Sequence, residues 1–234
     1  MKYFSSFLTL TISILFTSLA YGSLQFDANV QPGLKSQILH DFNFIQGIKG
    51  NNASPLHQRV FGEVDGTNYF AWFSKRVFSV GFNDCGNPAA VACVQEAPNK
   101  IWMTNNYIQF NHPQIARLAT VYHEARHTEV DNKRWPHAAC PTPFKDHQGN
   151  NVQSIWTGSF LSGQYACDIT AYGSYGSASI FLKNIGKYCI NCSEKVMADA
   201  NLYGNDQMER VIDPVSLKNM ITDLNTKSST LIIK

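Results

Sequence analysis

The residues with the clearest chemistry in this chain are His123-Glu124-Ala125-Arg126-His127, which fit the pattern HExxH. If the segment is helical, residues four apart lie on one face, and both imidazoles can reach one ion at about 2.0–2.1 Å. Glu124 is rotated off that face, where it can hold a water molecule and accept its proton. The pattern therefore predicts a Zn²⁺ site with His123 and His127 as ligands and Glu124 as the general base.

The flanking sequence favours the helix that this site needs. Pro113 is well placed at a helix start, because its missing N–H costs nothing there. No glycine or proline interrupts the run that follows, from Gln114 to Val130. Four residues spaced four apart lie along one face of this helix, so that the two histidines continue its apolar stripe: Ile115, Ala119, His123 and His127. We predict a helix over about residues 113–131 with the metal on its inner side.

The segment before this helix, Lys100 to Phe110, has the composition of a strand, with a break at Asn105-Asn106. A strand that leads into an HExxH helix resembles the arrangement of the zincin metallopeptidases, in which an edge strand pairs with the extended substrate. The resemblance covers about thirty residues and identifies no single family. It implies an edge strand next to the active helix and hydrolysis of peptide bonds.

A catalytic zinc normally takes a third protein ligand, and here the sequence leaves two candidates. The metzincin pattern fails at Val130 and Lys133, and the gluzincin pattern fails because no glutamate lies between Val130 and Ser193. Asp168 precedes Tyr172-Gly173 and resembles the aspzincin signature, although the spacing is one residue too long. His137 is the rival, if the chain doubles back after the helix. His147 and Glu194 remain as further alternatives.

Six cysteines follow an N-terminal segment that resembles a secretory signal peptide. That segment, residues 1–22, carries Lys2, a short apolar stretch and Ala20-Tyr21-Gly22 as a cleavage site. An even number of cysteines in an exported chain predicts disulfides, and sequence order suggests Cys85–Cys93, Cys140–Cys167 and Cys189–Cys192. The second bridge would bring His137 and Asp168 together, so that one binds the metal and the other orients a ligand. A redox role for Cys189–Cys192 is the alternative.

The overall charge excludes some partners. The formal net charge is +2, only 15% of the residues are charged, and there is no basic run. This gives no electrostatic reason to expect nucleic acid or an anionic membrane as a partner. The apolar stretch near the N-terminus is too short and polar to predict a stable membrane anchor after cleavage. We expect a secreted or periplasmic protein.

The rest of the chain predicts a single α+β domain over residues 23–234. Its parts are an upstream sheet at about 55–110, the helix at 113–131, a disulfide-pinned loop at 132–157 and a helical part at 158–234. Strands are expected at 59–64, 67–73 and 76–82, and helices at 34–44, 160–172, 177–188, 193–202 and 213–224.

The sequence favours a secreted zinc metallopeptidase that acts on a peptide or protein. The alternatives are a zinc-dependent amidase acting on peptidoglycan and a non-catalytic, disulfide-stapled binding protein with a zincin-like fold. If the site is catalytic, the oxyanion formed in hydrolysis needs a donor, and Tyr172, Tyr175 and Arg126 are candidates.

Overall fold

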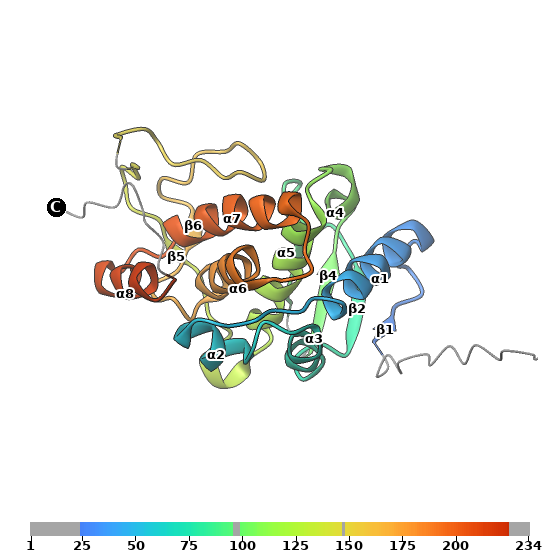
Figure 1. Ribbon diagram of the computed structural model, residues 1–234. Helices are drawn as coiled ribbons and strands as arrows, with labels where there is room; N and C mark the ends of the chain where they lie inside the picture. Colours follow the sequence, from blue (N-terminus) through green and yellow to red (C-terminus); the bar gives the residue numbers. More distant parts are fainter. Residues whose placement is uncertain (1–23, 96–98, 147, 225–234) are drawn as a thin grey trace, which may run out of the picture.

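The computed structural model describes residues 24–95, 99–146 and 148–224 and shows a mixed α+β fold (Figure 1). The helices are α1 Pro32–Gln46, α2 Pro55–Phe61, α3 Gly66–Ser74, α4 Asn106–Gln109, α5 Gln114–His127, α6 Ser174–Tyr188, α7 Glu194–Glu209 and α8 Pro214–Leu224, with a 3₁₀ turn at Val130–Asn132. The strands are β1 Gln25–Phe26, β2 Ser79–Phe82, β3 Ala92–Cys93, β4 Lys100–Met103, β5 Ala138–Ala139 and β6 Tyr165–Cys167.

The main sheet has the order β1-β2-β4-β3. Strands β1, β2 and β4 are parallel, and β3 runs antiparallel to β4 at the edge. The expectation that an edge strand leads directly into the HExxH helix is therefore wrong. The strand that precedes the helix, β4, is internal, and the short helix α4 separates it from α5. The edge strand next to α5 is β3, which precedes β4 in the chain and pairs with it antiparallel.

The strands expected at 59–64 and 67–73 are also wrong, because these segments form α2 and α3. Each helix starts at a cap. The Ser54 hydroxyl accepts from the His57 N–H before Pro55, and the Asp65 carboxylate accepts from the Thr67 N–H. Most of the aromatic residues that suggested strands are buried in the core: Phe61, Tyr69, Trp72 and Phe73. The strand expected at 76–82 is confirmed in its second half, as β2.

Helix α5 occupies the centre of the molecule and carries the HExxH residues. Its Tyr122 ring is fully buried, with its centroid 5.5 Å from that of Trp72 on α3 and 4.6 Å from that of Phe181 on α6. Helices α6 and α7 pack side by side across α5 (Figure 1). Because aromatic side chains from α3 and α6 pack on both sides of the Tyr122 ring, they fix the orientation of α5 relative to these two helices.

The C-terminal part contains one further correction. The helix expected at 160–172 is absent, because residues 165–167 form β6, which pairs with β5, and Asp168 pairs with Val211. Helix formation begins only at Ser174. The other expected helices are confirmed, including the Ser193 cap of α7 and the Pro214 start of α8. The helix expected at 34–44 is confirmed as α1.

All three expected disulfides are present: Cys85–Cys93, Cys140–Cys167 and Cys189–Cys192. Three bridges suggest an oxidising, extracellular environment. The third bridge closes a turn around Asn191 at the end of α6. The Asn191 side chain accepts from the Lys49 N–H and donates to the Gly47 carbonyl, which joins this turn to the α1–α2 connection. In the described ranges, no helix has the length and apolar character needed to cross a bilayer. The segment expected to be a signal peptide lies outside the described residues.

The cap of α2 gives a test of this packing. The Ser54 hydroxyl is buried and accepts two hydrogen bonds, from the His57 N–H at 3.3 Å and from Asn184 Nδ2 at 3.2 Å. We expect Ser54→Ala to lower the free energy of unfolding by about 1–2 kcal/mol, measured by urea denaturation with the disulfides intact. Ser193→Ala, at an exposed cap, is the matched control and should cost less. Equal losses would contradict the second role of Ser54.

Candidate metal centre

Three histidine side chains converge at the end of α5. The Nε2 atom of His127 lies 3.2 Å from Nε2 of His123 and 3.1 Å from Nε2 of His137. The three histidines form a group that could hold a metal ion. The sequence predicted the first two, because they share a helix face, and left His137 and Asp168 open as the third partner. The structure brings His137, and not Asp168, to the helix pair.

A sharp reversal of the backbone carries His137 back to the helix. Lys133, Arg134 and Trp135 have φ values of 53°, 61° and 45°, so three consecutive residues adopt the left-handed conformation. Such a run costs free energy at each residue and must be held by other contacts. The Glu129 carboxylate supplies them, since it accepts from Trp135 Nε1 at 2.7 Å, Arg76 Nε at 2.6 Å and Arg126 Nη1 at 2.7 Å.

Asp168 lies behind His137. Its Oδ1 atom is 3.2 Å from His137 Nδ1, and its Oδ2 accepts the backbone N–H groups of Tyr175 at 2.6 Å and Gly176 at 3.1 Å. The carboxylate is 2% exposed and bridges His137 to the N-terminus of α6. A Cβ atom on Gly173 would overlap it, so glycine is required there. The Cys140–Cys167 bridge closes the same region, as the sequence predicted. Asp168 thus fixes the direction in which His137 Nε2 points.

The donor set fits a metal ion. His127 Nδ1 lies 2.8 Å from the Arg134 carbonyl and His137 Nδ1 faces Asp168, so each Nδ1 carries the proton and each Nε2 presents a lone pair. Two nitrogens bound to one tetrahedral zinc lie about 3.3 Å apart, close to the separations found here. Burial lowers the pKa of His123 and lowers that of His127 to about 4, which keeps both rings neutral as ligands must be. Ser174 Oγ is a further polar neighbour, 3.0 Å from His127 Nε2.

Glu124 is 7% exposed and follows His123 on α5. Burial raises the pKa of its carboxyl to about 8. A cation held by the three histidines would act in the opposite direction and favour the carboxylate. Two cavities, of about 200 Å³ and about 340 Å³, meet at Glu124 and Ala92. Glu124 therefore borders both sides of the cleft in which the histidines lie.

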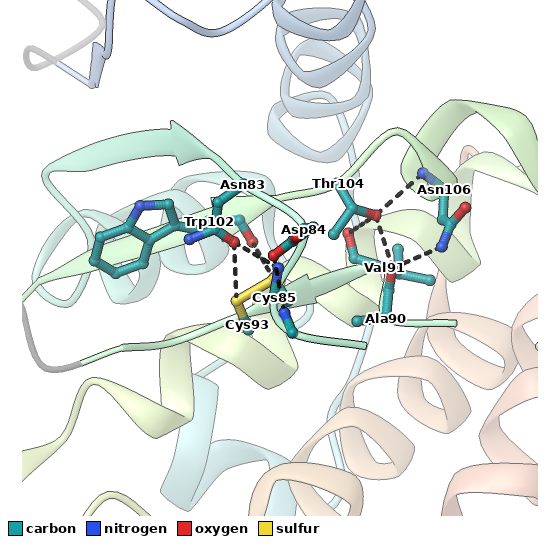
Figure 2. Close-up of a disulfide and its surroundings, with 10 residues drawn as sticks. Asn83, Asp84, Cys85, Ala90, Val91, Cys93, Trp102, Thr104 and Asn106 are labelled. Carbon is teal, nitrogen blue, oxygen red and sulfur yellow. Dashed lines mark hydrogen bonds between the residues drawn. A yellow bond between two sulfur atoms is a disulfide. The ribbon is translucent and has the colours of Figure 1, made fainter. Parts of the chain in front are cut away.

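The rim of this cleft is the edge strand β3 and the residues before it. Figure 2 shows how they are held: the Cys85–Cys93 disulfide links β3 to the loop after β2, and Thr104 and Asn106, just after β4, bind the segment before β3. Thr104 Oγ1 donates to the Ala90 carbonyl at 2.7 Å, and Asn106 Nδ2 donates to the same oxygen at 2.8 Å. The outer side of β3 has no partner strand in the described sheet, so it can pair with an extended chain.

Only one of the three expected oxyanion donors lines these cavities. The Tyr172 hydroxyl accepts a hydrogen bond from Arg59 Nη1 at 2.6 Å. The Arg126 guanidinium donates to the Tyr172 carbonyl and to Glu129. Tyr175 instead lines the smaller cavity with His123 and Glu124, and its ring lies 4.6 Å from the ring of His137. Arg210, whose guanidinium lies 4.6 Å from the Tyr175 ring, was missed in the sequence analysis, because nothing in its sequence context links the end of α7 to the start of α6.

Comparison with family models, with curated proteins and with solved structures gives no match. The interpretation of this site therefore depends on its own geometry.

Proposed function

We propose that this chain is a secreted, zinc-dependent metallopeptidase of the zincin type. His123, His127 and His137 hold the Zn²⁺, Asp168 orients His137, and Glu124 is the general base. The observation that carries the proposal is the convergence of three Nε2 atoms beside a buried carboxyl group, in a cleft bordered by an edge strand.

A bound zinc ion would supply Lewis-acid polarisation of a water molecule and of the substrate carbonyl. The chain itself does the rest. The free edge of β3 binds the extended substrate by main-chain hydrogen bonds and places its amide above the histidines. The Glu124 carboxylate accepts a proton from the attacking water and delivers it to the leaving amine nitrogen. The Tyr175 hydroxyl, next to Arg210, donates a hydrogen bond to the oxygen on which negative charge develops.

Metal removal tests the proposal. The protein should be produced with its disulfides formed, in medium supplemented with zinc, and analysed for metal and for cleavage of a mixed peptide library. We expect one zinc per chain, peptide hydrolysis that stops after treatment with 1,10-phenanthroline, and recovery on adding Zn²⁺ back.

The other outcomes separate the alternatives. Purified protein with no zinc after supplementation would contradict the metal site. A zinc-bound protein that cleaves peptidoglycan but no library peptide would be an amidase. A zinc-bound protein that cleaves neither would be a binding protein.

A further inference from the structure

The smaller cavity starts at His123 and Glu124 and extends away from the histidine cluster, beneath a loop. It measures about 200 Å³. Its lining comes from the segment that leads into β3, from helices α5, α6 and α7, and from residues 154–157. Sites for whole small molecules occupy about 300–1,000 Å³, so this space suits a single side chain.

The walls of the cavity combine very small side chains with aromatic ones. Alanines form the two long sides: Ala90 and Ala92 from the β3 segment, and Ala116 and Ala119 from α5. Trp156 and Tyr203 close the far end. Small residues along the walls leave room for a long or wide group, and aromatic faces at the end offer it an apolar contact.

Besides Glu124, which the proposed mechanism uses, the charged lining residue in the described part of the chain is Arg210, and it is already neutralised. Arg210 donates from Nε at 3.2 Å and from Nη2 at 2.9 Å to the same oxygen of Asp206, and the two side chains are 4% and 9% exposed. Gln207 Nε2 donates to that oxygen as well, at 2.8 Å. Beyond Glu124, towards Trp156 and Tyr203, the charge of a guest side chain would therefore be buried without a partner, which is strongly unfavourable.

The far end is preformed. The His112 ring lies 3.9 Å from the Trp156 ring, and its two nitrogens lie 2.6 Å from the Tyr203 hydroxyl and 3.2 Å from the Trp156 carbonyl. The Ile155 N–H also bonds to Asp206 at 2.9 Å. These contacts fasten the loop to α7, so the cavity exists before any ligand arrives.

We propose that this cavity selects the substrate by accepting one large uncharged side chain, aromatic or long aliphatic, next to the bond that is cleaved. The inference rests on the proposed peptidase function. The side chain enters past Ala92 and Ala119 and packs on Trp156 and Tyr203. Aspartate, glutamate, lysine and arginine are rejected at that one position.

The first test is a peptide library with two variants that change the cavity in opposite ways. Wild type should favour phenylalanine, tyrosine, leucine or methionine at one position beside the cleaved bond by about tenfold or more in kcat/KM over charged residues. Thr120→Phe narrows the cavity from α5 and should shift the preference to alanine and serine. Trp156→Ala lengthens it and should relax the upper size limit. Thr222→Phe, on the exposed face of α8, is the matched control and should leave the preference unchanged.

The second test needs no hydrolysis and no metal. N-acetylphenylalaninamide is titrated into the metal-free protein, and the indole NMR signal of Trp156 is followed, assigned by its loss in Trp156→Phe. We expect this signal to shift and that of Trp72 to stay, with no shift from the aspartate or lysine amide. No shift, or equal shifts with the charged amides, would overturn the pocket even if peptides are cleaved. A selective shift in a protein that cleaves nothing would keep the pocket and reject the peptidase.

Discussion

Glu124→Gln is expected to keep its zinc and lose peptide hydrolysis by a factor of about 10²–10⁴, the usual loss when a general base is removed. The carboxyl group borders both cavities but does not belong to the group of three nitrogens that face one another. Glutamine has the same shape and cannot accept the proton. Zinc content is measured on the purified variant, and kcat/KM on the best peptide from the library.

The control for this variant is Glu194→Gln, an exposed change of the same kind at the start of α7. It should leave both zinc content and hydrolysis at the wild-type level. Full activity in Glu124→Gln would refute the mechanism, because among the described residues that line the two cavities Glu124 is the only acid. Loss of zinc together with activity would instead assign Glu124 to the metal site.

The part of the site that the sequence predicted is the part carried by one regular helix. His123, Glu124 and His127 lie within five consecutive residues, and helical geometry alone fixes their relative positions. The Cys140–Cys167 bridge was also predictable from cysteine order, and with it the approach of His137 to Asp168. Both inferences depend on local spacing or on a covalent link, and neither needs the rest of the fold.

The sequence could not decide whether His137 or Asp168 is the third metal ligand. The answer depends on backbone conformations that the residue types do not predict. Lys133 and Trp135 rarely adopt positive φ, and they do so here because Glu129 and its cationic partners hold the turn. Without these positive φ values at residues 133–135, the chain would not bring the His137 side chain to His123 and His127. The same holds for Arg210, which reaches Tyr175 only through the packing of α7 on α6.

The strand predictions near residues 59–73 failed for a related reason. Val60, Phe61, Tyr69, Phe70 and Phe73 are residue types that favour strands. The capping side chains Ser54 and Asp65 outweigh that preference, because each satisfies an N–H group at a helix start. Burial of Phe61, Tyr69 and Phe73 in the common core then stabilises the helices. Capping and tertiary packing together therefore override the strand preference of these residue types.

His137→Ala is expected to abolish stoichiometric zinc binding, because it removes one of three converging nitrogens. Asp168→Asn should act more mildly, weakening zinc affinity by about 10–100-fold, since the side chain only orients His137 from behind. Asparagine keeps an oxygen that can still accept from the N–H groups at the start of α6. Competition with a chromogenic chelator gives both affinities, and circular dichroism checks that each variant is folded.

His40→Ala serves as the control for removing a histidine, because that side chain is 71% exposed and stands outside the cluster. It should bind zinc as tightly as wild type. The order of the two effects separates the two assignments of the third ligand. If Asp168 itself bound the metal, Asp168→Asn would abolish binding and His137→Ala would only weaken it. That reversed order would refute the three-histidine site while leaving His123 and His127 in place.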